Sequence, residues 1–145
     1  MSAAVRAQSA ERRIAASPRL QASVRLLGEV PHGRIETVLN SADLFVLGSH
    51  SEGAGFALIE AMACGVVPAV TDIPAFRVVT GDGAVGALWP PGDDAACAAA
   101  IVAAAAPPVE AKSDAVRVHF ERRLSFPALA RSALAGYREL SVLPG

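Results

Sequence analysis

Short runs of consecutive apolar residues recur along this chain of 145 residues, each bounded by glycine, proline or polar residues. Runs of this length predict buried β-strands. We expect four of them, at residues 24–28, 44–48, 66–71 and 87–89. Because these strands are apolar at nearly every position, both of their faces must be covered, which is typical of a parallel sheet.

Stretches in which apolar residues recur at helical spacing separate and follow the predicted strands. We expect helices at residues 1–17, 34–42, 56–64, 94–106 and 126–140. Gly65 occupies the left-handed position beyond the third helix, and Asp93 or Asp94 can cap the fourth. Pro107 and Pro108 end the fourth helix, so residues 107–114 are predicted to form a loop. The alternation predicts an α/β fold, a Rossmann-like parallel sheet with helices on both faces.

Composition and charge exclude several classes of protein. The chain is 52% hydrophobic and 19% charged, with a net charge of −1, so it lacks the basic excess of a nucleic-acid-binding domain. The sequence contains no run of eighteen apolar residues, so no membrane span is expected. The first residues lack the apolar core of a secretory signal. We expect a cytoplasmic location, with attachment to the periphery of a membrane left open.

Cysteine and histidine usage gives no indication of a disulfide framework or a metal site. Cys64 and Cys97 lie in alanine-rich stretches, where small buried thiols are expected. The three histidines are far apart and have no Cys or His at metal-ligand spacing. We therefore expect no zinc site.

Residues 44–65, LFVLGSHSEGAGFALIEAMACG, hold the most informative pattern. A predicted strand ends, a turn containing Gly53 and Gly55 follows, and a helix begins near Phe56. Such a helix start lies at the carboxyl edge of a parallel sheet, where α/β proteins bind ligands. Its free N–H groups and positive dipole end attract phosphate. The pattern predicts a phosphate-binding turn, although many nucleotide-binding folds share it.

Two carboxylates flank this helix start, Glu52 in the turn and Glu60 in the helix, with seven residues between them. Eight helical steps span about 12 Å, similar to the length of an extended nucleotide-sugar. An ionised carboxylate only accepts hydrogen bonds, which suits it to binding sugar or ribose hydroxyls. The alternative is that Glu60 is a helix-surface residue and Glu52 a favourable charge near a helix start. The pattern alone favours neither interpretation.

The E-x7-E arrangement, followed by EAMACG, resembles the retaining glycosyltransferases of family 4, which have the GT-B fold. The resemblance extends over about residues 20–140 and is carried by VRLLGEVPHGRIETVLNSADLFVLGS, VVPAVTDIPAF, GALWPPGD and FPALARSALAGYREL. It implies that residues 1–145 are part of the family's C-terminal donor-binding domain. Residues 124–145 would form the C-terminal helix that packs on an N-terminal domain absent from this sequence.

The resemblance also implies roles for single residues. Glu52 is expected to act as the catalytic residue that contacts the donor sugar, and Glu60 to bind the ribose hydroxyls. A loop beside the nucleobase would contain Glu29 and Val30. The backbone amides of the turn would bind the sugar and phosphates; they belong to Gly53, Ala54, Gly55, Phe56 and Ala57.

On this resemblance we expect the donor-binding part of a glycosyltransferase that needs neither a metal nor a cofactor. It would move a hexose from a nucleoside-diphosphate sugar to an acceptor that the sequence does not specify, with retention of configuration. A catalytically inactive nucleotide-binding or interaction module derived from the same fold is the alternative. The family's basic phosphate-binding motif has no counterpart before residue 20, and the acceptor domain is missing too. We therefore expect the isolated chain to be inactive.

The family's sheet has the strand order 3-2-1-4-5-6, and residues 24–28 resemble strand 3 while residues 44–48 resemble strand 4. The two strands expected between them are not in the sequence. Either residues 24–28 pair in another way or a gap remains in the sheet. Since unpaired buried backbone groups are costly, we expect an isolated chain that self-associates or packs loosely.

Three further features have plainer interpretations. Residues 81–86 fit G-x-G-x-x-G but precede a predicted strand instead of joining a strand to a helix, so a surface turn is expected. His50 lies beside the candidate turn and is expected to be exposed to water. Arg77 is as well explained by a solvated loop as by a phosphate contact.

Overall fold

The computed structural model describes residues 3–141, and the chain divides into two compact units, residues 1–32 and 33–145. In the first unit, α1 (Ala3–Ala15) packs against α2 (Pro18–Ser23). The side chain of Ser17 caps α2 by accepting a hydrogen bond from the backbone N–H of Leu20, at 3.4 Å. The helix expected at residues 1–17 is thus confirmed over the part that the structure describes.

The prediction of a strand at residues 24–28 is wrong. These residues form an irregular segment in which Leu26 and Leu27 are 53% and 52% exposed. A strand is stable only where a neighbouring strand satisfies its backbone N–H and C=O groups. None of the described strands pairs with this segment. Its backbone therefore has no hydrogen-bonded neighbouring strand, and its leucine side chains stay exposed.

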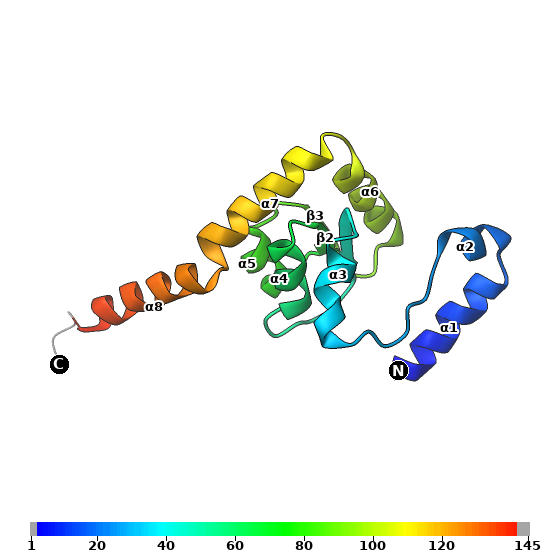
Figure 1. The fold of residues 1–145 in the computed structure, drawn as a ribbon, viewed down its shortest axis with the longest axis horizontal. Helices are drawn as coiled ribbons and strands as arrows, with labels where there is room; N and C mark the ends of the chain where they lie inside the picture. The colour runs from blue at the N-terminus through cyan, green and yellow to red at the C-terminus, as the bar shows by residue number, and fades with distance from the viewer. Residues whose placement is uncertain (1–2, 142–145) are drawn as a thin grey trace. The chain divides into compact units, whose positions relative to one another are not determined.

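The second unit contains most of the regular structure (Figure 1). A 3₁₀ turn at His32–Arg34 leads into it. The helices are α3 (Ile35–Leu39), α4 (Phe56–Ala63), α5 (Pro74–Thr80), α6 (Asp94–Ala105), α7 (Val109–Arg123) and α8 (Phe126–Ser141). The strands are β1 (Leu44–Leu47), β2 (Val67–Thr71) and β3 (Ala87–Trp89).

The three strands form one parallel sheet in the order β1-β2-β3, which confirms the predicted α/β fold. Leu44 lies opposite Val67, and Thr71 lies opposite Trp89. Both crossovers run in the same direction along the sheet. Because such crossovers are right-handed, α4 and α5 lie on the same face, and they contact each other. Helix α6 packs against all three strands.

The core of this unit is centred on β2, which is buried at every position. Successive residues of a strand point to opposite faces, so both faces of β2 are covered. The largest fully buried side chain is Phe76 of α5. Leu58 and Met62 of α4 and Val116 of α7 pack in the same cluster.

The loop predicted at residues 107–114 is also wrong, because α7 begins at Val109. Pro108 occupies the N-cap position, where the fixed φ of proline is compatible with a helix start. Lys112 then fastens α7 to the end of α6. Its Nζ donates hydrogen bonds to the carbonyl oxygens of Ala103, Ala104 and Ala106, at 2.7, 3.2 and 2.6 Å. These bonds satisfy carbonyls that a helix end leaves unpaired.

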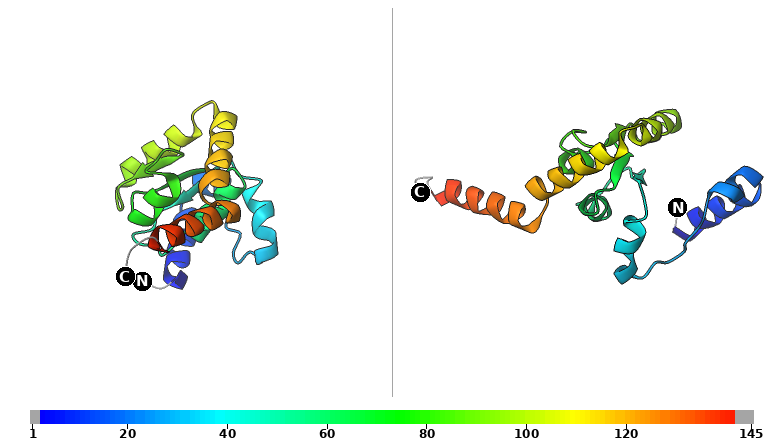
Figure 2. Two further views of the ribbon diagram at one scale, coloured as in Figure 1. Left: turned by 90° about the vertical axis from the view of Figure 1, so that its left-hand side faces the viewer. Right: turned by 45° about the horizontal axis from the view of Figure 1, so that its top comes forward.

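Helix α8 follows a break at Leu124 and Ser125, visible between the last two helices in Figure 2. Ser125 donates to the carbonyl oxygen of Glu121, at 2.8 Å, and closes α7. The helix itself confirms the one predicted at 126–140. Its apolar side chains are largely exposed, with Phe126 at 89%. Together with Phe126, four more exposed residues form an apolar stripe along the helix: Leu129, Leu134, Tyr137 and Leu140.

The two glycines before β3 give a test of this packing. Gly83 and Gly86 both have a φ of +80°, so alanine at either is strained by about 1–2 kcal/mol. A Cβ at Gly86 would also collide with the backbone oxygen of Pro68 in β2, whereas at Gly83 it would only touch Leu88, at 3.4 Å. We expect Gly86→Ala to lower the free energy of unfolding by about 3 kcal/mol or more, and Gly83→Ala by about 1–2.

Urea denaturation of both variants would measure the difference. Equal losses would contradict the close contact between the turn and β2.

Candidate functional site

The carboxyl ends of the three strands all lie at one edge of the sheet, because the strands are parallel. The turn of residues 48–55 follows β1, residues 72–73 follow β2, and residues 90–93 follow β3 and lead into α6. Asp93 caps α6 by accepting from the N–H of Ala96, at 2.8 Å, as predicted. The sheet therefore brings the turn that holds Glu52 close to the start of α5.

Hydrogen bonds hold the turn after β1 in place. The hydroxyl of Thr71, at the end of β2, donates to the carbonyl oxygen of Ser49, at 2.6 Å. The hydroxyl of Ser49 in turn donates to Oε1 of Glu52, at 2.7 Å. Glu52 is exposed, so its carboxylate is oriented by the turn and remains accessible from solvent.

The turn ends at Gly55, the N-cap residue of α4, which has a φ of +68°. A Cβ at this position would lie 3.1 Å from the ring of Phe76, so both the backbone conformation and the contact beneath it favour glycine. No side chain of the described residues caps α4. Within residues 3–141, the N–H groups of Phe56 and Ala57 have no hydrogen-bond partner. The positive end of the helix is therefore open to an anion.

The predicted donor-binding residues thus lie along one continuous segment. Gly53 and Ala54 lie in the exposed turn, and Phe56, 74% exposed, is the first residue of α4. Glu60 is half-buried one turn further along α4. Glu29 and Val30 belong to the first unit, and their role beside a nucleobase stays a prediction.

Glu60 acts electrostatically on its neighbour Cys64 at the end of α4. The pKa of the Cys64 thiol is raised, first by burial and then by the charge of Glu36, with Glu60 adding to the effect and Arg117 opposing it. Both cysteines are half-buried free thiols, so they are less enclosed than the sequence predicts.

Arg77 is held by a carboxylate at this edge. It lies on α5, not in a loop, and donates to both oxygens of Asp72, from Nε at 2.5 Å and from the terminal nitrogen at 2.6 Å. The hydrogen bond and charge of Asp72 raise the pKa of the Arg77 guanidinium. Asp72 therefore already neutralises a side chain that the sequence allowed as a phosphate ligand.

The glycines of residues 81–86 and the side chain of His50 lie in turns, as the sequence predicts. Residues 81–86 form a turn before β3, so the G-x-G-x-x-G match is not a nucleotide-binding turn. His50 is exposed in the turn after β1. Among residues 3–141, no three His, Cys, Asp or Glu side chains gather where they could hold a metal ion. No single helix there is long and apolar enough to cross a membrane. Helix α6 and the following run Val109–Leu140 together reach the required length and composition, but they are bent by 97° at the break between them.

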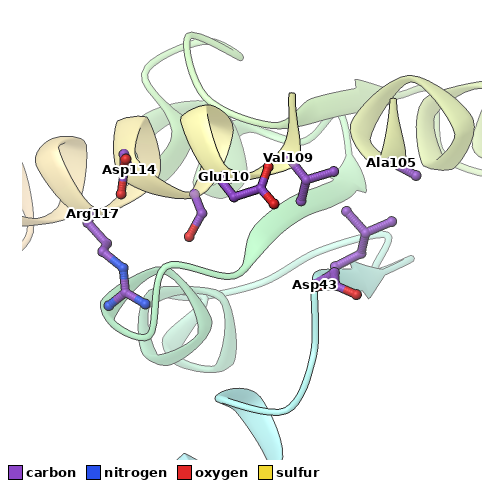
Figure 3. Close-up of a pocket in the computed structure, with 8 residues that line it drawn as sticks. Asp43, Ala105, Val109, Glu110, Asp114 and Arg117 are labelled. Carbon is purple, nitrogen blue, oxygen red and sulfur yellow. The ribbon is translucent and has the colours of Figure 1, made fainter. Parts of the chain in front are cut away.

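A pocket of about 790 Å³ lies at the other, amino edge of the sheet (Figure 3). It is formed where β1 begins and where α6 gives way to α7. Its lining comprises Asp43, Leu44, Ala105, Val109, Glu110, Ser113, Asp114 and Arg117. None of the predicted site residues lies in it. No pattern in the sequence indicated this amino-edge pocket.

These features define an α/β protein whose β1–α4 turn presents backbone N–H groups between two carboxylates at the carboxyl edge of a parallel sheet. The family model described as Glycosyl transferases group 1 matches residues 7–113. The chain belongs to this family, and the predicted glycosyltransferase relationship is confirmed at that level.

Three curated relatives show the same relationship. The chain is 42% identical over 73 residues to a phosphatidyl-myo-inositol mannosyltransferase of Mycobacterium leprae, a match covering 50% of this chain and 20% of that protein. It is 39% identical over 57 residues to the GPI3 subunit of the phosphatidylinositol N-acetylglucosaminyltransferase of Saccharomyces cerevisiae, covering 39% and 13%. A phosphatidylinositol N-acetylglucosaminyltransferase component of Arabidopsis thaliana is 35% identical over 75 residues, covering 52% and 17%. These matches span a fifth or less of each relative.

The charges around Cys64 give a prediction in a Cys97→Ser background. Only the thiolate reacts with iodoacetamide. Because Arg117 lowers the pKa of Cys64 and Glu36 raises it, we expect Arg117→Gln to move the midpoint of alkylation to higher pH and Glu36→Gln to lower pH. The measurement is the alkylation rate against pH, with Arg122→Gln as a control of equal charge change. Identical shifts in the two arginine variants would contradict the local effect.

Proposed function

We propose that this chain is the donor-binding part of a retaining glycosyltransferase that works without a metal. It would transfer a hexose from a nucleoside-diphosphate sugar to an acceptor. The observation that carries this proposal is the uncapped start of α4 between Glu52 and Glu60, in a chain that belongs to a glycosyltransferase family. Retention and metal independence rest on the resemblance of this segment to the family 4 enzymes.

Charge and hydrogen-bonding capacity assign the parts of the donor. The diphosphate would lie against the N–H groups of the turn and of Phe56 and Ala57, where the helix dipole favours negative charge. Glu60, half-buried on α4, would accept hydrogen bonds from the ribose hydroxyls. Glu52, exposed in the turn, would accept them from the sugar. As the bond to the sugar breaks, charge develops on the leaving phosphate, and the same N–H groups would stabilise it.

We further propose that α8 packs against an acceptor-binding domain of a longer enzyme. Its apolar stripe is exposed from Phe126 to Leu140 in this chain. Burying apolar surface contributes about 25 cal/mol per Å², so an uncovered stripe of this length favours a partner. The matched segments, a fifth or less of each curated relative, are consistent with this arrangement.

A catalytically inactive binding module is the second candidate. It is favoured by the pairing of Arg77 with Asp72, which occupies the guanidinium at the edge where a diphosphate would need cations. Such a module would bind a nucleotide-sugar without transferring its sugar. Sugar transfer by the protein expressed from its full gene distinguishes the two candidates.

Replacing Glu60 tests the ribose assignment. Glu60→Ala removes hydrogen bonds from a carboxylate, each of which contributes about 1.5–3 kcal/mol. We expect the dissociation constant for UDP or GDP to rise at least tenfold for a loss of about 1.4 kcal/mol or more. Isothermal titration calorimetry would measure it, with Glu110→Ala on α7 as the control. Unchanged nucleotide affinity would reject the role of Glu60.

Replacing Glu52 tests the sugar assignment. Glu52→Ala leaves the turn amides and Glu60 in place, so we expect nucleoside-diphosphate affinity to stay the same. In the protein expressed from its full gene, sugar transfer should fall by at least about a hundredfold, as for the loss of one group that stabilises a transition state. Loss of nucleotide binding together with retained turnover would show that the two glutamates have been assigned the wrong way round.

A further inference from the structure

We infer that Ser49 is a positioning residue for Glu52, and that Thr71 fixes Ser49 to the sheet. This inference rests on the proposed function, because it concerns the carboxylate assigned to the sugar. Three residues from two strand ends form one chain of hydrogen bonds, from Thr71 to Ser49 and from Ser49 to Glu52.

The chain begins at a rigid point. Thr71 is the last residue of β2, lies opposite Trp89 of β3 and is 2% exposed. Its hydroxyl donates to the carbonyl oxygen of Ser49, 22 residues earlier, at 2.6 Å. A buried hydroxyl that lost this acceptor would be left unsatisfied. The bond therefore holds the first part of the turn against the central strand.

Ser49 carries this restraint to the carboxylate. Its hydroxyl donates to Oε1 of Glu52 at 2.7 Å, a hydrogen bond strengthened by the charge of the acceptor. Oε2 accepts no hydrogen bond within the described residues, so it stays available to a sugar hydroxyl. An exposed glutamate would otherwise sample several rotamers and lose that freedom when the donor binds.

The two glutamates of the site differ in this respect. Among residues 3–141, no side chain donates a hydrogen bond to Glu60, which is restrained by its place on α4 and by partial burial. Glu52 has no helix to fix it and depends on Ser49. The inferred role thus belongs to the sugar end of the donor and leaves the nucleotide end unaffected.

Calorimetry with UDP-glucose and GDP-mannose, each compared with its own nucleoside diphosphate, tests the inference. We expect Ser49→Ala to weaken binding of the nucleotide-sugar about tenfold, with the nucleoside diphosphate bound as before. Thr71→Val should act in the same way, and Thr71→Ser, which keeps the hydroxyl, should restore the affinity. Ser51→Ala is the matched control, because Ser51 lies in the same turn without a hydrogen-bond partner among residues 3–141. Equal weakening of both kinds of ligand would show a general structural role and overturn the inference.

A second readout does not need the donor. Three-bond couplings in the NMR spectrum report whether the Glu52 side chain keeps one χ1 rotamer. We expect one rotamer in the natural chain and in Ser51→Ala, and averaging in Ser49→Ala. The same averaging in all three would overturn the inference. If the natural chain bound neither nucleotide-sugar nor nucleoside diphosphate, the proposed function would fail, and the couplings would still decide the role of Ser49.

Discussion

The complete burial of β2 is the constraint on which the rest of this structure depends. A strand between two parallel neighbours, apolar at nearly every position, must have helices on both faces. The right-handed crossovers place α4 and α5 on one face, and α6 packs against all three strands. Because β2 fixes the sheet, it also fixes where its own last residue, Thr71, meets the turn after β1. The geometry of the candidate site thus begins in the core.

The site itself consists of backbone more than of side chains. The left-handed Gly55 turns the chain into α4, and Phe76 fills the space below it. Without a side-chain cap, the first N–H groups of α4 face solvent, and they supply the positive charge that Arg77, paired with Asp72, does not. A site of this kind suits a ligand that is anionic in the middle and rich in hydroxyls at both ends.

The sequence predicted the parts of the fold in which pattern and packing agree. Strands β1, β2 and β3, the helix start at Phe56 and the Asp93 cap all follow from local signals that the core reinforces. Residues 24–28 show the opposite case. The sequence already lacks the two strands expected beside them, and none of the described strands pairs with this apolar run. Helix α7 begins directly after Pro108, inside the predicted loop. Helix α5 begins at Pro74 and ends before Gly81, and the apolar pattern did not predict it.

The predicted site residues Glu52 to Glu60 lie on one turn and one helix, so their spacing was visible in the sequence. The hydrogen bond from Thr71 to Ser49 joins residues 22 positions apart, and only the parallel register brings them together. The same holds for Phe76 beneath Gly55. The spacing of neighbouring site residues can be predicted from the sequence, whereas the contacts with distant residues that hold them in place depend on the tertiary structure.

Lys112 is the only lysine in the sequence, and it has a consequence for experiments on assembly. Its ammonium group has three protons to donate, and three carbonyl oxygens at the end of α6 accept from it. Cross-linkers that attack lysine, the usual reagents for mapping contacts between proteins, would therefore find one lysine in this chain, and its ammonium group is already engaged in the fold. Cross-linkers that react with carboxylates or with the two thiols are better suited to mapping the contacts of this chain with other proteins.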